Sequence, residues 1–297
     1  MNPRLEADAA TEAPTLLFLH LPKAGGTTLR SVLSRQFPRA AVLDAYPTPE
    51  SDARRRQGDG GLPPALAAVP RDERGRLALV NGHFTYGIHA AFGAPCRYLT
   101  FLREPVARVI SLYHHAHDHE NHAMHPLIHD DGLSLRELLE ADVNALEYDD
   151  AQTRLVAGFD VVEEFRRAVA DDTEGVLRRA VQHLEDHFDV VGAMEAFDTS
   201  LLLAADRYGW DDVHYTNRNV TRRSRSAGRT AEVSRLIRAH NPLDVRLYEY
   251  AKERLRRDVR RAGPGFRARL FRFECEASVR ALRRKLQSIR ARARRSG

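Results

Sequence analysis

The chain has 297 residues, of which 43% are hydrophobic, enough to bury the core of one large α/β domain with or without an appendage. Its two cysteines, Cys96 and Cys275, lie far apart, which excludes a disulfide framework and a cysteine-based zinc site. The segment 1–14 lacks the apolar core of a signal peptide, and no apolar run is long enough to cross a bilayer. We therefore expect a disordered segment over 1–14 and a cytoplasmic protein that is at most peripheral to a membrane.

The positive charge of the chain is concentrated near its end. The formal net charge is +5, but residues 261–295 hold twelve Arg and Lys residues against Glu274 and Glu276. The overall basicity of the chain is therefore a property of this tail. It does not indicate that the preceding residues bind nucleic acid. After the hinge 262–265, apolar residues at helical spacing predict a basic amphipathic helix within 261–297. They are Phe271, Cys275, Val279, Leu282, Leu286 and Ile289. The sequence leaves open whether this helix contacts an anionic membrane surface, mediates self-association as a coiled coil or docks on its own domain, with nucleic-acid binding as the remaining option.

The first predicted element is a strand, loop and helix over residues 16–37. An apolar run breaks at Pro22-Lys23, passes Gly25 and Gly26, and resumes at helical spacing. Backbone N–H groups from Gly25 to Thr28 would be free at the start of the helix, where the helix dipole is positive. Lys23 adds a full charge in a chain that otherwise uses arginine almost exclusively. The junction is therefore predicted to bind an anion.

Two further strands are predicted to end in polar side chains. Residues 44–75 read as a long surface excursion with a short helix near 62–69. A buried strand over 77–80 then leads into His83, and a strand over 97–103 ends at Arg103, where Pro105 starts a helix. We expect an α/β fold, a P-loop-like parallel sheet flanked by helices, with Lys23, His83 and Arg103 together at the carboxyl ends of the strands.

The remaining elements are mostly helical. Helices are predicted over 133–140, 149–157, 174–188, 197–208, 231–240 and 243–260, with one strand over 189–194. The polar stretch 214–229 reads as a loop or flap.

The arrangement of Lys23 differs from that of a nucleotide triphosphatase. A Walker A loop carries its lysine after the glycines, whereas Lys23 precedes them, and the strand that ends at Arg103 offers no carboxylate for magnesium at that position. Ser111 lies eight residues after Arg103, about two helical turns on, so both side chains could reach one further anionic group. The seven histidines between 114 and 129 are interpreted as a wall of an acceptor site or as plain surface, and no metal is expected.

Two segments together carry a family resemblance. HLPKAGGTTL (20–29) and FLREPVARVISLY (101–113) resemble the 5′-phosphosulfate and 3′-phosphate motifs of sulfotransferases that use 3′-phosphoadenosine 5′-phosphosulfate (PAPS). The resemblance is closest to the carbohydrate-directed branch that includes heparan sulfate 2-O-sulfotransferase. VNGHFTYGIH (80–89) looks like the histidine segment of that branch, and DDAQTRLVAG (149–158) extends the likeness. It covers about residues 15–260, the expected sulfotransferase domain.

The resemblance implies roles for individual residues. His83 would be the general base, and Asn81 stands where the 2-O-sulfotransferase has a second histidine, which puts a two-histidine mechanism in doubt. Arg222 and Arg223 would close over the phosphates or meet an anionic acceptor, with a solvated loop as the alternative. The remaining residues would hold the two ends of the cofactor: Lys23, Ala24, Gly25, Gly26, Thr27 and Thr28 at the 5′-phosphosulfate, and Arg103 and Ser111 at the 3′-phosphate.

The expected reaction is in-line transfer of a sulfuryl group from PAPS to a hydroxyl of a carbohydrate, glycoconjugate or small metabolite, leaving 3′,5′-adenosine bisphosphate (PAP). His83 would deprotonate the hydroxyl, and Lys23 with the loop amides would stabilise charge on the departing phosphate. Two alternatives remain: a P-loop kinase that uses ATP and magnesium, and a non-catalytic anion-binding protein.

Overall fold

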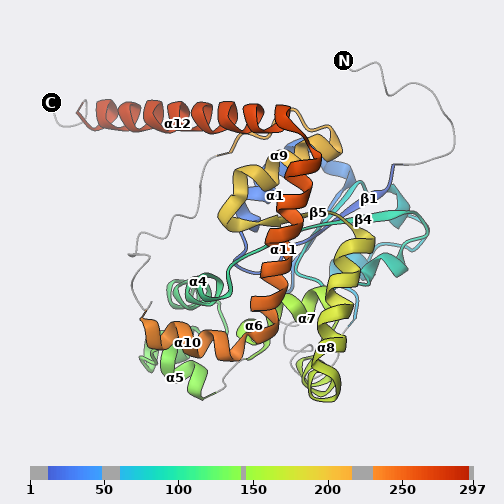
Figure 1. The fold of residues 1–297 in the computed structure, drawn as a ribbon, viewed down its shortest axis with the longest axis vertical. Helices are drawn as coiled ribbons and strands as arrows, with labels where there is room; N and C mark the ends of the chain where they lie inside the picture. Colours follow the sequence, from blue (N-terminus) through green and yellow to red (C-terminus); the bar gives the residue numbers. More distant parts are fainter. Residues whose placement is uncertain (1–12, 49–60, 142–144, 216–229, 294–297) are drawn as a thin grey trace.

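The fold is built on one parallel sheet of five strands. The computed structural model describes residues 13–48, 61–141, 145–215 and 230–293. The strand order is β2-β3-β1-β4-β5, and every neighbouring pair is parallel (Figure 1). The strands are β1 (Thr15–Leu19), β2 (Val42–Ala45), β3 (Leu79–Gly82), β4 (Cys96–Leu102) and β5 (Phe188–Ala193).

Helices connect the strands and cover both faces of the sheet (Figure 1). The α-helices are α1 (Gly26–Gln36), α3 (Pro64–Ala67), α4 (Pro105–Asp118), α5 (Leu135–Glu140), α6 (Ala145–Tyr148), α7 (Ala151–Ala157), α8 (Val162–His187), α9 (Phe197–Tyr208), α10 (Ala231–His240), α11 (Pro242–Arg261) and α12 (Pro264–Ala293). Short 3-10 turns occupy Arg39–Ala41, Arg74–Arg76, Ile88–Ala91 and Met194–Ala196, and a π-helical turn occupies Pro126–Asp130.

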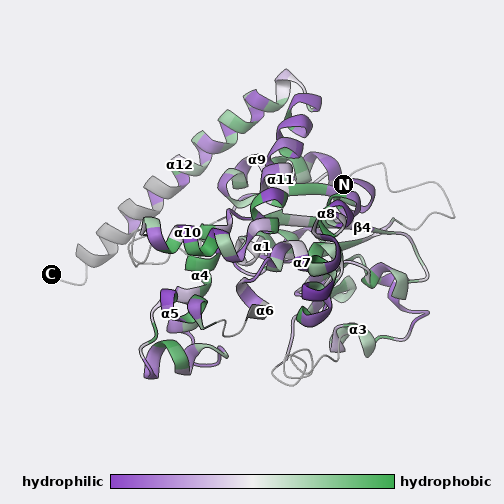
Figure 2. Cartoon of the chain, turned by 60° about the horizontal axis from the view of Figure 1, so that its bottom comes forward, coloured by the Kyte–Doolittle hydropathy of each residue, from purple (hydrophilic) through white to green (hydrophobic). Residues whose placement is uncertain are grey.

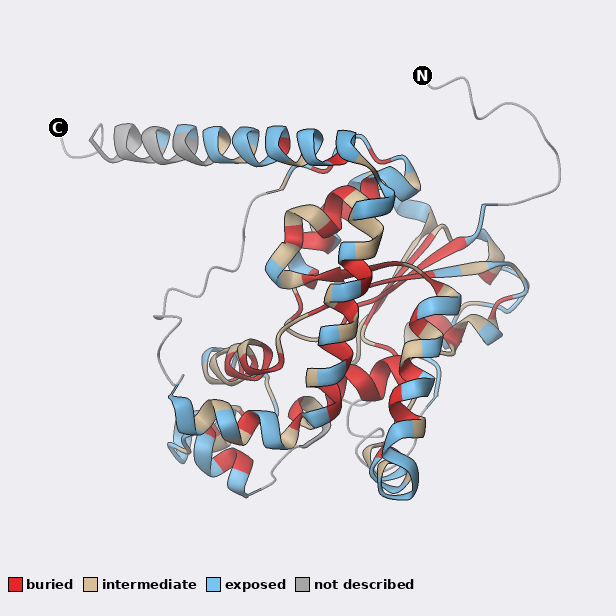
Figure 3. Ribbon diagram, in the orientation of Figure 1, coloured by how far each residue is buried: buried red, intermediate tan, exposed pale blue. Residues whose placement is uncertain are grey.

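Alternating side chains of β1 fill two separate cores. Leu17 and Leu19 pack with residues of α7, α8 and α11 on one face of the sheet. Leu16 and Phe18 pack with residues of α1 and α9 on the other face. Both faces are therefore buried, and Figure 3 shows the sheet as a largely buried layer. A third cluster joins α4, α5 and α10 beside the sheet.

The predicted parallel α/β fold is confirmed, and the strands expected at 77–80, 97–103 and 189–194 lie within two residues of β3, β4 and β5. The sequence analysis missed β2, because it placed the start of a surface excursion at Asp44. This four-residue edge strand has only Ala45 fully buried and is followed by Pro47, so it carries little hydrophobic pattern. Its register pairs Ala45 with Gly82.

The helix expected over 174–188 is longer than predicted. Helix α8 begins at Val162, and its backbone leaves helical geometry at Asp172 (φ −152°, ψ 84°). The Asp172 carboxylate accepts the N–H of Gly175 at 2.7 Å and so caps the second half of the helix. The predicted helix corresponds to this second half.

Helix α12 docks through a face different from the apolar stripe seen in the sequence. Phe266 and Phe273 are buried and Leu270 is half-buried in the core that contains α1 and α9. Phe271, Cys275 and Val279 of the predicted stripe are exposed. None of the described helices is long and apolar enough to cross a membrane.

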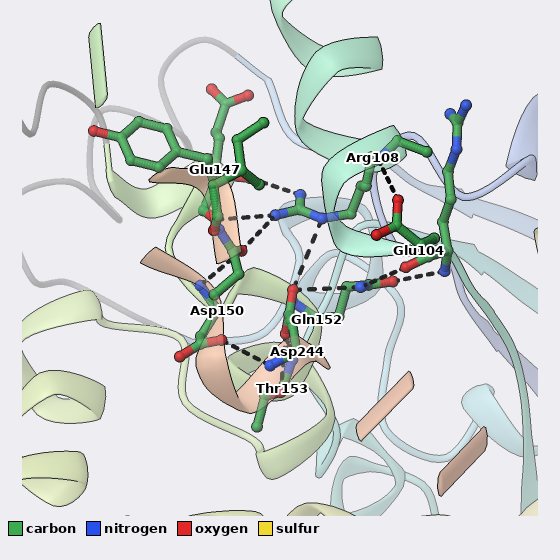
Figure 4. A network of polar contacts seen from close by, with 12 residues as sticks. Glu104, Arg108, Glu147, Asp150, Gln152, Thr153 and Asp244 are labelled. Atoms are coloured by element: carbon green, nitrogen blue, oxygen red, sulfur yellow. Dashed lines mark hydrogen bonds and ion pairs between the residues drawn. The ribbon is translucent and has the colours of Figure 1, made fainter. Parts of the chain in front are cut away.

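A buried polar network ties α4, α7 and α11 together (Figure 4). The Arg108 side chain is fully buried, donates to the carbonyls of Glu147 (2.8 Å) and Tyr148 (3.1 Å), and lies 3.8 Å from the Asp244 carboxylate. Asp244 also accepts from the backbone and hydroxyl of Thr153 at 2.7 and 2.8 Å. Burial and the nearby Asp244 raise the pKa of Asp150, so the cation of Arg108 balances one buried carboxylate here.

We predict that Arg108→Met lowers the free energy of unfolding by about 3–5 kcal/mol, because it leaves the Asp244 carboxylate buried without its cation. Urea unfolding followed by circular dichroism measures the change. Arg246→Met is the matched control, since Arg246 pairs with Glu174 at the surface and its loss should change stability little. Equal stability of the two variants would show that the Arg108 pair is not required.

Candidate active site

The loop between β1 and α1 contains two residues with left-handed backbone conformations. Lys23 has φ 68°, which is unusual for a residue with a side chain, and Gly25 has φ 83°. The N–H of Ala24 donates to the carbonyl of Leu21 at 3.2 Å, which closes the turn. Local strain of this kind is found where the surrounding structure over-determines a functional conformation.

Both glycines of the loop are required by close packing. A Cβ on Gly26 would lie 1.7 Å from Nε2 of His20, and a Cβ on Gly25 would lie 2.3 Å from the Met194 sulfur. The positive φ of Gly25 adds a conformational requirement. The loop therefore sits between the His20 imidazole and the segment that follows β5.

The set of backbone donors is smaller than the sequence predicted. The expectation that every N–H from Gly25 to Thr28 is free is wrong for Thr28, whose N–H donates to the Gly25 carbonyl at 3.1 Å. The N–H of Ala24 is also bonded, and its side chain is buried. The N–H groups of Gly25 and Gly26 have no backbone acceptor within the described residues, so they are the donors best placed for an anion at this helix start.

Lys23 and Arg103 are brought together, as predicted. Nη1 of Arg103 donates to the carbonyl of Lys23 at 2.8 Å, so the cation at the end of β4 holds the loop that follows β1. Burial and the neighbouring Arg103 guanidinium lower the pKa of Lys23 to about 8, and Glu147 partly opposes this shift. Two cations held this close repel each other, and a bound anion would relieve that repulsion.

Arg103 does not pair with its neighbour Glu104 at the described contacts. The Glu104 carboxylate caps α4 by accepting the N–H of Ala107 at 2.8 Å, and its other oxygen pairs with Arg238 at 2.8 Å. These contacts engage both oxygens of the Glu104 carboxylate.

His83 follows β3 directly and lies next to the loop. Its Nδ1 is 2.6 Å from the carbonyl of His20, which must accept, so Nδ1 carries the proton and the ring lone pair is on Nε2. This is the tautomer a general base needs when its second nitrogen faces the substrate.

A second histidine, His20, lies beside His83 with ring centroids 4.4 Å apart. Its Nδ1 is 3.0 Å from the Tyr46 hydroxyl, which donates to Asn81 at 3.0 Å. Burial is the main reason that the pKa of His20 lies well below its usual value, and nearby positive charges lower it further. The His20 ring is therefore neutral. Asn81, which stands where the 2-O-sulfotransferase has its second histidine, is buried and donates to the Asp44 carboxylate at 2.5 Å. Asn81 therefore supports the site through hydrogen bonds to neighbouring side chains.

Gln152 fixes the backbone of Arg103. Its amide oxygen accepts the N–H of Arg103 and its amide nitrogen donates to the carbonyl of Arg103, each at 2.9 Å. Asp244 in turn accepts from this amide at 3.3 Å (Figure 4). The Gln152 side chain therefore connects the buried polar network to Arg103 in the site.

Helix α4 carries Ser111 and His115 on one face. Ser111 is half-buried on this helix, and His115 lies one turn further on the same face. Burial and the Lys23 charge lower the pKa of His115 to about 4, so it is neutral near pH 7. Its ring contacts His119 and His122, and His122 Nε2 lies 3.1 Å from Glu147. The charge of Lys23 therefore acts on part of the histidine-rich segment, and the interpretation of this segment as an acceptor-site wall or plain surface stays a prediction.

The remaining predicted residues are less informative. Thr27 is exposed at the first turn of α1, and Thr28 is buried. Arg222 and Arg223 lie outside the described residues. His125, His129 and Asp130 have ligand atoms within 4.8 Å of one another and could hold a metal ion, and the last two are exposed.

Sequence reasoning missed the residues that support the site. His20 and Gln152 stood inside the quoted motifs without a role, while Tyr46 fell in the supposed excursion. No local sequence signal marked these residues, since Gln152 is 49 positions from Arg103 and Tyr46 is 26 positions from His20.

We predict that Gly26→Ala weakens binding of PAP, the product that the resemblance implies, by at least about tenfold, because its methyl group overlaps the His20 ring. Calorimetric titration measures this. The double variant Gly26→Ala/His20→Ala should recover most of the affinity, since it removes the clash. If the double variant binds no better than the single one, the packing explanation fails.

Comparisons with known proteins place the chain in a family. The family model described as galactose-3-O-sulfotransferase matches residues 3–294. Galactose-3-O-sulfotransferase 3 of Homo sapiens is 29% identical over 286 residues, 91% of this chain and 63% of that protein, and the mouse protein is 28% identical over 95% and 65%. The chain thus spans less than two thirds of these relatives. A crystal structure of mouse sulfotransferase SULT7A1 complexed with PAP gives a TM-score of 0.30 at 15% identity over 77% of this chain and 66% of that one, too low to support an argument. The family match extends over nearly the whole chain, which therefore belongs to the galactose-3-O-sulfotransferase family.

Proposed function

We propose that this protein transfers a sulfuryl group from PAPS to a hydroxyl of a galactose-containing carbohydrate. The observation that carries the proposal is the clamp between the Arg103 guanidinium and the Lys23 carbonyl, which holds two cations and the glycine loop at adjacent strand ends. The family membership and the names of the relatives support the galactose acceptor.

The residues present fit the proposed donor. Lys23 and the N–H groups of Gly25 and Gly26 would hold the 5′-phosphosulfate, and Arg103 with Ser111 would hold the 3′-phosphate. PAPS would supply the sulfuryl group and PAP would be its product. Lys23 precedes the glycines, whereas a Walker A loop carries its lysine after them, which argues against a P-loop kinase.

The roles of the protein groups follow from their geometry. His83, with its proton on Nδ1, takes the proton of the acceptor hydroxyl on Nε2. The Lys23 ammonium and the loop amides stabilise the negative charge that develops on the phosphate side. His115, neutral and on the α4 face near Lys23, contributes to the wall against which the sugar lies.

Two expectations from the sequence stay predictions. The first is that Arg222 and Arg223 close over the phosphates of the cofactor. The second is a cytoplasmic location, which the comparisons do not support.

We predict that PAP binds in calorimetric titration whereas ATP with magnesium binds far more weakly. Lys23→Ala should weaken PAP binding by about tenfold or more, the worth of one charge-assisted contact. Tight ATP binding with no response to PAP would overturn the proposed function in favour of the kinase.

His83→Ala should bind PAP within about threefold of the unchanged protein but lower kcat for sulfation of a galactoside by about 100-fold to 10,000-fold. His240→Ala, on α10, is the matched control and should keep its turnover. Near-normal turnover of the His83 variant would remove its assignment as the base.

We predict that PAP affinity falls by about tenfold per pH unit above pH 8, because the ammonium of Lys23, whose pKa is about 8, loses its proton there. Below about pH 7 nearly all of the ammonium is charged, so its contribution is nearly complete. Calorimetry between pH 7 and pH 9.5 measures the slope. In Lys23→Met the slope should disappear, and its persistence would assign it to another group.

A further inference from the structure

The apolar residues of α12 lie on two opposite faces of the helix. Each residue advances about 100° around the axis, which places Phe266, Leu270 and Phe273 within about 60° of one another. By the same count Phe271 and Val279 lie about 130–150° from the centre of this docked face, one on each side of the point opposite it. They are 69% and 49% exposed and are two of the three exposed large hydrophobic residues among those described.

The docked face fixes the orientation of the helix. Phe266 is fully buried, and Phe273 stacks on His214 with ring centroids 5.7 Å apart and an interplanar angle of 8°. Arg269 pairs with Asp206 of α9. Because these contacts hold one side of α12 against the domain, the opposite side cannot turn inward. We call Phe271, Cys275 and Val279 the outer stripe.

Cations flank the outer stripe on both sides. Arg267 lies about 80° to one side of it, and Arg272 and Arg283 lie about 60–80° to the other. All three are exposed. Residues 264–293 hold nine Arg and Lys residues against Glu274 and Glu276. Figure 2 shows hydrophobic and hydrophilic bands alternating along the described part of α12.

We infer that the outer stripe docks on an anionic lipid surface. An apolar stripe flanked by arginines matches a helix that lies in a membrane interface, where the arginine stems follow the apolar side and their charges meet lipid phosphates. A second copy of the chain would bring like charges together, whereas anionic lipid neutralises them. Figure 1 shows α12 extending past the body of the domain, where a flat surface can reach it. The sequence continues the spacing with Leu282, Leu286 and Ile289.

The test is sedimentation of the full chain with vesicles of phosphatidylcholine alone or mixed three to one with phosphatidylglycerol. Binding should require phosphatidylglycerol and weaken as salt rises. The double variant Phe271→Ser/Val279→Ser should lower vesicle partition by at least about tenfold. Arg272→Gln and Arg283→Gln should each lower it by about fivefold.

Two controls separate the outer stripe from general effects. Leu62→Ser changes the third exposed large hydrophobic residue, on a different part of the chain, and should leave partition unchanged. Arg136→Gln removes an exposed arginine of α5 and should also leave it unchanged.

Three results would overturn the inference. They are failure to bind the anionic vesicles, equal binding by Phe271→Ser/Val279→Ser, and a vesicle-independent dimer that this double variant abolishes in sedimentation velocity. The last result would assign the outer stripe to a second copy of the chain. PAP binding is measured separately, so none of these outcomes depends on the proposed function.

Discussion

Like-charge repulsion between Lys23 and Arg103 is the interaction around which the site is arranged. Both cations stand at the ends of neighbouring parallel strands, and the guanidinium is fixed by its bond to the Lys23 carbonyl. Burial and this repulsion together lower the pKa of Lys23, and the same residue has a left-handed backbone conformation. Such an arrangement persists only where the rest of the structure holds it in place. It becomes favourable when an anion with several charges lies between the cations and the loop amides.

Two sets of contacts hold Lys23 and Arg103 in this arrangement. Behind β4, Gln152 satisfies both backbone groups of Arg103, and Asp244 and Arg108 connect it to α11 and α4. Behind the glycine loop, the His20 ring fills the space that any side chain at position 26 would need. The same His20 offers its carbonyl to His83 and so selects the tautomer of the proposed base. One residue therefore shapes the anion loop and orients the group that would act on the acceptor.

Much of this fold was predictable because local patterns were strong. The strands β1, β3, β4 and β5 are short, buried and apolar, and Pro105 and the glycines mark the following turns. The pattern was weak for β2, since an edge strand with exposed positions does not need apolar residues. The stripe on α12 illustrates the reverse case: its periodicity was real, but the helix docks through Phe266 and Phe273 and turns that stripe outward. The spacing of apolar residues in a sequence shows that one face of a helix is apolar. It does not show what that face packs against.

The sequence by itself determined where the polar groups meet, because Lys23, the glycines, His83 and Arg103 each follow a strand and parallel strands end at one edge of a sheet. The kind of chemistry came from the resemblance of segments 20–29 and 101–113 to sulfotransferase motifs. Only the tertiary structure decided how these groups act on one another. Residues 46, 81, 152 and 244 are distant in the chain from the loops they support, and nothing local requires their hydrogen bonds. Which N–H groups of the loop are bonded within the protein, which nitrogen of His83 carries the proton and where the pKa of Lys23 lies all depend on contacts between separate elements. Those quantities follow from packing, and packing is not a property of any single segment.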